Sequence, residues 1–92
     1  MNRFLSLALL FGLVGCKPKD RLDSADAALI IGLEAAYRPF EYVDQDGQIT
    51  GVSVEIGRRI AEKMGRKVEF RNMQFDGLIP ALQTGNIDMI IS

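Results

Sequence analysis

The 92-residue sequence predicts an α/β domain built on a parallel sheet. Short apolar runs typical of buried strands alternate with single helical segments, which indicates βαβ units with helices on both faces of the sheet. Hydrophobic residues make up 48% of the chain and charged residues 25%, as in globular proteins. The net charge of −1 argues against nucleic-acid binding. With no histidine and a single cysteine, His-dependent triads, His-rich metal sites and an intramolecular disulfide are excluded, and we expect no metal and no cofactor.

Residues 1–15 are predicted to form a lipoprotein signal peptide. Arg3 gives a basic start, and residues 4–14 form an uncharged, mostly apolar run that is too short to span the ~30 Å hydrocarbon core of a bilayer. Small residues then precede Cys16, which resembles a bacterial lipobox with Cys16 as the acylated residue, for example with palmitate. The alternative for the apolar run is a buried helix of the fold, and the alternative for Cys16 is a free buried cysteine. Polar residues 16–27 are expected to form a flexible tether.

The first predicted strand covers residues 28–33, an apolar run that is β-branched in its middle. Pro39 prevents an easy continuation of this strand because it lacks an N–H. Residues 40–43 and 48–52 flank an Asp- and Gly-containing segment, which predicts a β-hairpin or an extended excursion.

The first predicted helix begins at Ser53 as N-cap and ends at Gly65 as the residue after the C-cap. Its apolar stripe consists of Ile56, Ile60, Ala61 and Met64. The opposite face carries acids and bases at i,i+4 spacing: Glu55 with Arg59, Arg58 with Glu62, and Glu62 with Arg66. We interpret this face as solvated, with an anion-binding patch as the alternative.

Residues 67–71 alternate in polarity and predict a second strand. Asp76 is predicted to cap a second helix that ends at Gly85, with Pro80 in or near the first turn. Residues 87–91 are another apolar run that predicts a buried strand.

Four ordered segments carry a resemblance to a known family. Residues 31–41, 47–55, 74–83 and 86–92 resemble the first strand and loop, the entry to the first helix, the second helix and the following strand of the bacterial extracellular solute-binding proteins, family 3, polar amino-acid class. The resemblance implies that residues 28–92 form the first part of lobe 1 of a type II periplasmic-binding-protein-like fold. It also implies a truncated chain, with the carboxylate-binding Arg and the second lobe beyond Ser92.

The same resemblance implies a set of ligand-binding residues. Glu34 matches an acidic position near the ligand, although a loop acid or a structural hydrogen-bond acceptor is the alternative. Tyr37 matches an aromatic that stacks on the ligand side chain, and Phe75 matches an apolar or aromatic wall. Phe40 either contacts the ligand or anchors the loop in the core. Ser92 matches the position whose carbonyl or hydroxyl takes the ligand ammonium.

The function implied by the resemblance is that of a non-enzymatic lipoprotein that captures an amino acid and delivers it to the permease of an ABC importer. We expect a monomer, lipid-anchored through Cys16 on the periplasmic or extracellular face of a membrane, with no nucleic-acid partner. Two alternatives stay open: an enzyme on the same fold, similar to cyclohexadienyl dehydratase or to the lobe of a lytic transglycosylase, or the ligand-sensing lobe of a receptor.

Overall fold

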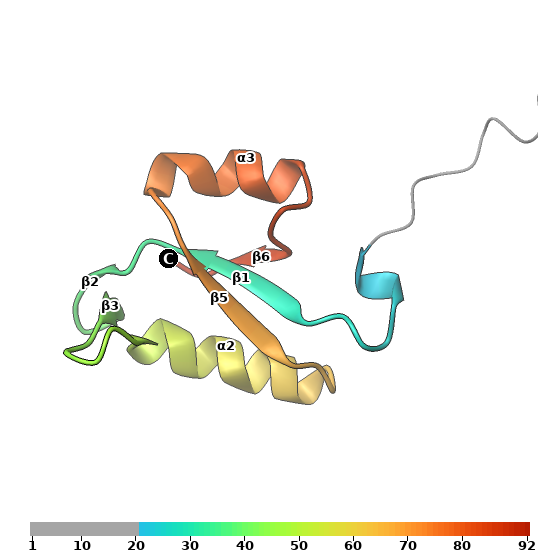
Figure 1. Ribbon diagram of the computed structural model, residues 1–92, viewed down its shortest axis with the longest axis horizontal. Coiled ribbons are helices and arrows are strands. Elements are labelled where there is room, and N and C mark those ends of the chain that lie inside the picture. The colour runs from blue at the N-terminus through green and yellow to red at the C-terminus, as the bar shows by residue number, and fades with distance from the viewer. Residues whose placement is uncertain (1–20) are drawn as a thin grey trace, which may run out of the picture.

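The computed structural model describes residues 21–92, and it has three layers (Figure 1). A parallel sheet with strand order β5-β1-β6 lies between helix α2 on one face and helix α3 on the other, which confirms the predicted α/β class. The sheet contains β1 (Leu29–Leu33), β5 (Val68–Asn72) and β6 (Met89–Ile90), and the helices are α2 (Val52–Lys63) and α3 (Leu78–Gln83). Residues 1–20, with the predicted signal peptide and Cys16, lie outside the described residues.

Strand β1 is the centre of the sheet, and all of its residues are buried. Leu29 pairs with Val68 of β5, and Ile31 pairs with Met89 of β6, both in parallel register. Its side chains alternate between two clusters, as expected of a strand covered on both faces. Leu29 and Ile31 pack with Ala61 of α2, whereas Ile30 packs with Leu78 and Ile87 on the α3 side.

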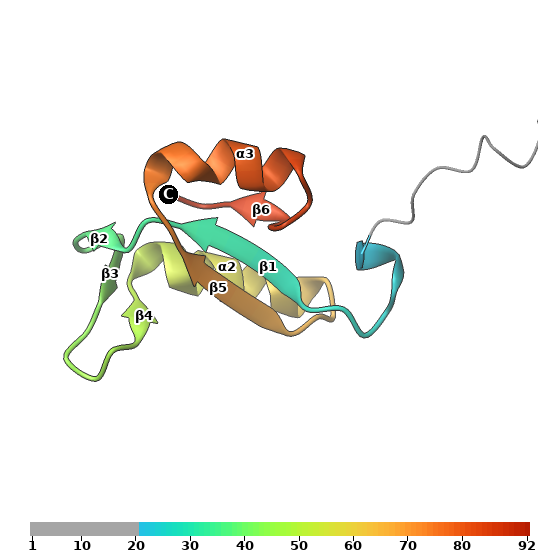
Figure 2. The same ribbon diagram turned by 45° about the horizontal axis from the view of Figure 1, so that its top comes forward.

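A small antiparallel sheet projects from the carboxyl end of β1 (Figure 2). It consists of β2 (Ala36–Tyr37), β3 (Glu41–Val43) and β4 (Ile49–Thr50). The β3–β4 connection is the predicted hairpin: the Asp44 carboxylate accepts hydrogen bonds from the N–H groups of Asp46 and Gln48, both at 2.9 Å. An Asp at this position stabilises a turn by replacing backbone acceptors with its side chain.

The start of α2 differs from the prediction, because Ser53 does not cap it. Gly51 is the N-cap residue, and the first free N–H groups of the helix donate to main-chain carbonyls of the segment between β2 and β3, Val52 to Pro39 and Ser53 to Phe40. Gly51 has φ +120°, and a Cβ there would lie 2.3 Å from the Phe40 oxygen, so only glycine fits this junction. The serine hydroxyl is therefore available for another contact. The predicted C-terminal end is confirmed, since Gly65 has φ +67°.

The buried face of α2 also differs from the predicted stripe. Ala61 is buried and Ile60 packs beside it, as predicted, but Ile56 and Met64 are each 47% exposed, and the buried Gly57 was not part of the predicted stripe. A Cβ at Gly57 would lie 2.8 Å from both Ile31 Cδ1 and a Phe70 ring carbon, so the helix approaches the sheet at a glycine rather than at its largest apolar residue. The sequence pattern favoured bulky residues and missed this close approach.

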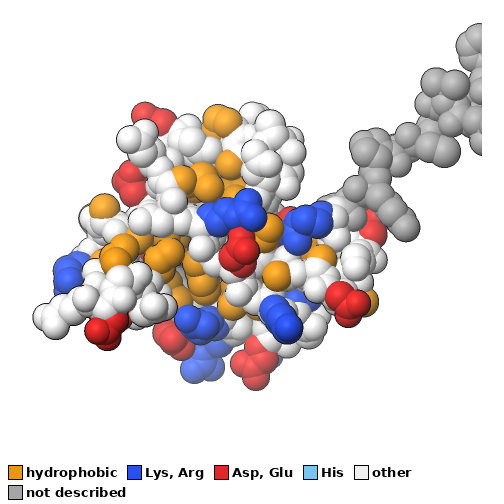
Figure 3. Space-filling model, in the orientation of Figure 1, with side chains coloured by type: hydrophobic (Ala, Val, Ile, Leu, Met, Phe, Trp, Pro, Cys, Tyr) orange, Lys and Arg blue, Asp and Glu red, His pale blue; other side chains and the backbone are white. Residues whose placement is uncertain are grey.

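The outer face of α2 is solvated, in agreement with the interpretation of its sequence. Acidic and basic side chains are interspersed along the edge of the molecule that α2 forms (Figure 3). The predicted i,i+4 ion pairs are not formed: the described residues contain two ion pairs, Arg21 with Asp88 and Arg71 with Glu69. Arg66 instead donates to the main-chain carbonyls of Leu22, Ser24 and Ala27.

The second helix is likewise not capped by Asp76. A 3-10 turn, η2 (Phe75–Gly77), runs directly into α3, and no side chain of either segment caps them. The Phe75 N–H at this start donates to Glu34, from the loop after β1. A carboxylate distant in sequence thus fills the role assigned to Asp76.

The predicted tether, residues 16–27, is described only from Arg21 onward, and this part contacts the domain. It contains the 3-10 turn η1 (Arg21–Asp23), and Leu22 packs against the cluster formed by Leu29, Ile31 and Ala61. No helix within residues 21–92 is long and apolar enough to cross a membrane.

Candidate functional site

The candidate site lies at the carboxyl end of β1. Ligands of open α/β sheets bind beyond this edge of the strands. A pocket of about 220 Å³ is found there. Its lining comes from strands β2 and β3, from the turn η2, from the loop that follows β1 and from Ser92. The lining residues are Glu34, Ala36, Tyr37, Glu41, Phe75 and Ser92. Four of the five predicted ligand residues therefore share one pocket, and Phe40 is the exception.

Glu34 has a structural role in addition to its place in the pocket. Its Oε2 accepts a hydrogen bond of 3.0 Å from the Phe75 N–H, and this bond fixes the carboxylate between the two sides of the pocket. Among the described residues, no partner is found for Oε1, so half of the carboxylate remains free for a ligand. The structural acceptor that the sequence left open as an alternative is thus present, and it still leaves one oxygen to face a ligand.

Two aromatic side chains line the pocket and a third stacks on one of them, and all three are exposed. Tyr37 is 64% exposed, Phe75 59% and Phe40 44%. The Tyr37 and Phe40 rings stack with centroids 5.3 Å apart, so Phe40 supports Tyr37 from outside the pocket. Exposed aromatic faces at the mouth of a pocket provide surfaces on which a ligand can stack. Arg38 points elsewhere, because its guanidinium lies over the Tyr42 ring at 4.2 Å.

Glu41 is the residue that sequence reasoning missed. It is 3% exposed at the start of β3, and its carboxylate accepts hydrogen bonds from the hydroxyls of Ser53 at 2.6 Å and Ser92 at 3.0 Å. The Ser92 hydroxyl in turn accepts from the Glu34 N–H at 3.3 Å. One signal was available: an acid inside a predicted strand is uncommon, since glutamate is depleted in strands and is almost never fully buried without a partner.

A larger depression, about 460 Å³, lies at the opposite edge of the sheet. Its charged lining residues are Arg21 and Asp88, which form an ion pair with each other. Asp88 also accepts from the Ile30 N–H at 2.8 Å. The charges at this edge are therefore satisfied within the chain. Across residues 21–92 there is no group of three or more potential metal ligands.

Comparison with known proteins assigns the family. Residues 29–92 match the bacterial extracellular solute-binding proteins, family 3. The chain belongs to this family. It is 45% identical over 69 residues to the L-arginine-binding protein of Pseudomonas aeruginosa, covering 75% of this chain and 27% of that protein. It is 37% identical over 89 residues to the probable ABC transporter arginine-binding protein ArtJ of Chlamydia trachomatis, a match that covers 97% of this chain and 34% of that protein.

A solved structure agrees with this assignment. This chain is similar to the crystal structure of the arginine-bound form of domain 1 from TmArgBP, with a TM-score of 0.74 and 43% identity. The match covers 82% of this chain and 59% of the other. The fold is thus that of domain 1 of an amino-acid-binding protein, as the sequence resemblance implied. The chain spans about a quarter to a third of the length of the two curated relatives.

Proposed function

We propose that the protein carrying this chain is an extracytoplasmic solute-binding protein that captures an amino acid and delivers it to an ABC importer. The observation that carries the proposal is the convergence of Glu34, Tyr37, Phe75 and Ser92 on one pocket at the carboxyl edge of the sheet. The two curated relatives are named for arginine binding, and one for an ABC transporter. None of these names describes an enzyme.

The pocket favours a ligand with a cationic side chain. Its lining contains two acids, Glu34 and Glu41, and no Lys or Arg. Tyr37 and Phe75 offer aromatic faces beside the free oxygen of Glu34, and a guanidinium or ammonium group binds favourably both to such faces and to a carboxylate. L-Arginine satisfies both features, and it is our leading candidate.

A thermal-shift screen of the full-length protein against the twenty amino acids and opines tests this proposal, because a ligand that binds the folded state raises its apparent stability. We expect the largest shift with L-arginine, followed by L-lysine, and calorimetry then gives the affinity. A largest shift with an acidic or apolar amino acid would contradict the cationic specificity. No shift with any amino acid would contradict the solute-binding role.

We also propose that Cys16 carries the membrane anchor. The support is the short apolar run that ends in small residues before this cysteine. Mass spectrometry of the protein purified from a bacterial membrane should find an N-terminal acylated Cys16. An unmodified and uncleaved N-terminus would contradict the anchor without affecting the ligand assignment.

A further inference from the structure

Glu41 is a buried acid at the floor of the pocket. It is 3% exposed, yet it is one of the residues that line the pocket beside Glu34 and Ser92. Removing an ionised carboxylate from water is costly, and the cost is offset only by donors or a counter-charge. Here the donors are two hydroxyls, from Ser53 on one oxygen and Ser92 on the other.

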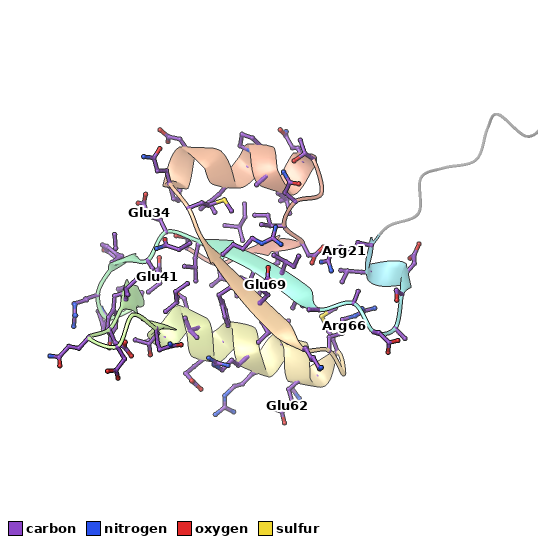
Figure 4. The ribbon with its side chains drawn as sticks, in the orientation of Figure 1. Arg21, Glu34, Glu41, Glu62, Arg66 and Glu69 are labelled. Carbon is purple, nitrogen blue, oxygen red and sulfur yellow. The ribbon has the colours of Figure 1, made fainter. Side chains whose placement is uncertain are left out.

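The counter-charge of Glu41 is not found among residues 21–92. The two ion pairs of this part of the chain involve Asp88 and Glu69, and no Lys or Arg side chain lies within ion-pair distance of Glu41. The contrast with Asp88 is informative, because that acid is similarly enclosed and is paired with Arg21. Figure 4 shows Glu41 beside Glu34 at one end of the sheet, whereas Arg21 and Arg66 lie at the other.

The bond to Glu41 determines how Ser92 can act. A serine hydroxyl has one proton to donate and two lone pairs that accept. The proton of Ser92 is directed to Glu41 Oε1, and one lone pair accepts from the Glu34 N–H. The remaining lone pair is all that this hydroxyl can offer to a ligand, so Ser92 acts toward the pocket as an acceptor and not as a donor.

We propose that Glu41 is a positioning residue that makes the pocket selective for ligands with an α-ammonium group. It accepts the proton of the Ser92 hydroxyl and thereby leaves the remaining lone pair of that hydroxyl to accept from a bound ammonium. This inference rests on the proposed function, because it concerns how the same pocket recognises an amino acid.

Glutamine cannot reproduce this arrangement. A carboxylate accepts from both serines, whereas a carboxamide has one oxygen and one NH₂ group. In a Glu41→Gln variant whose amide oxygen is directed toward Ser53, the amide NH₂ group faces Ser92 and turns the serine proton toward the pocket. If the amide is turned the other way, its NH₂ group faces the Ser53 hydroxyl, which donates to the carboxylate in the unmodified protein. Both orientations of the amide remove the negative charge of Glu41.

The test compares two probes in the full-length protein, L-arginine and 5-guanidinopentanoic acid, which lacks only the α-ammonium. We expect the unmodified protein to prefer L-arginine strongly. The variant Glu41→Gln should bind L-arginine about tenfold more weakly, since a hydrogen bond involving a charged group contributes about that much. Its affinity for the analogue should remain within about twofold of the original, by the same reasoning. The exposed Glu62→Gln is the matched control and should leave both affinities unchanged.

Ser92→Ala separates positioning from general stabilisation. If Glu41 acts through Ser92, then Ser92→Ala should also lose affinity selectively for L-arginine, and the double variant should be no weaker than Ser92→Ala alone. Because Ser92→Ala leaves the bond between Ser53 and Glu41 in place, this variant keeps the test available even where Glu41→Gln fails to fold. An equal loss for both probes, in either single variant, would overturn the proposal.

The two hypotheses fail in different ways. Equal binding of both probes by the unmodified protein overturns the role of Glu41, while the solute-binding function stands. If the screen identifies another amino acid, the same comparison is made with that amino acid and its analogue lacking the α-ammonium. If no amino acid binds, the proposed function is wrong and the role of Glu41 is wrong with it.

Discussion

The two ends of strand β1 differ in how their charges are satisfied. At the amino end, the Asp88 carboxylate, whose side chain is 7% exposed, is paired with Arg21, and Arg66 donates to main-chain carbonyls of the segment that precedes β1. At the carboxyl end, the buried Glu41 has two hydroxyl donors and no cation among the described residues, and aromatic rings stand exposed around it.

This difference indicates which depression is a site and which is part of the scaffold. The larger one, at the amino end, has its charged lining already paired. Within residues 21–92, the smaller one has an acid with no counter-charge and apolar surface with no cover, which are the features expected where a ligand completes the structure. Pocket size alone would have selected the wrong end.

The largest expected effect comes from a substitution at Gly51, where the start of α2 contacts the segment beside the carboxyl end of β1. Gly51→Ala should destabilise the protein by about 3 kcal/mol, because the new Cβ would strike the Phe40 carbonyl in a backbone conformation that favours glycine. Gly47→Ala is the control: it also has positive φ, but it has open space, and should cost about 1 kcal/mol. Denaturant unfolding of the full-length protein measures both, and equal losses would contradict the clash.

The next effect removes the acid at the amino end. Asp88→Ala leaves the Ile30 N–H without its acceptor and Arg21 without its counter-charge, and we expect a loss of about 2 kcal/mol in the free energy of unfolding. Ligand affinity should not change, since the substitution lies at the edge away from the pocket. The exposed Asp46→Ala serves as control, and a weaker affinity in Asp88→Ala would show that the two ends are coupled.

The third effect concerns the aromatic rim. Tyr37→Ala should weaken L-arginine binding about tenfold, through loss of a stacking surface, while stability changes by less than about 0.5 kcal/mol because the ring is exposed. Tyr37→Phe keeps the ring and should retain most of the affinity. Calorimetry on both variants decides, and an unchanged affinity in Tyr37→Ala would remove this ring from the site.

The smallest effect sharpens the description of the amino end. Arg66→Lys keeps the charge but loses the planar group that reaches the carbonyls of Leu22, Ser24 and Ala27, and should cost about 1 kcal/mol. Hydrogen exchange should rise locally in residues 21–27. Arg59→Lys, on the solvated face of α2, is the control, and protection that stays the same in Arg66→Lys would contradict the attachment of this segment.

The sequence predicted the elements well where the determinant is local. The apolar run of β1, the hairpin turn at Asp44 and the glycine after α2 were all found, because strand burial, turn chemistry and helix termination depend on neighbouring residues. The caps assigned to Ser53 and Asp76 were wrong, because groups distant in sequence satisfy those helix starts. The prediction of Glu34, Tyr37, Phe75 and Ser92 came from family resemblance, and the pocket brings these residues together.

Glu41 shows what local patterns leave out. Its burial follows from the packing of β3 against α2 and from a hydroxyl 51 residues away, neither of which is visible in its neighbours. A pattern of polar and apolar residues places an acid on the surface by default. Contacts of this range require the fold itself.

The central position of β1 also has a consequence for how the chain folds. One edge of this entirely buried strand pairs with β5. Its other edge stays unpaired until β6 docks, and β6 lies more than fifty residues further along the chain. Before β6 docks, an apolar strand with open backbone groups is exposed, and such edges promote aggregation of folding intermediates. Pairing over so long a stretch of chain is slow, because loop closure precedes the gain from contact. The floor of the pocket is therefore among the last features to form, and factors that shield β1 until then should raise the yield of active protein.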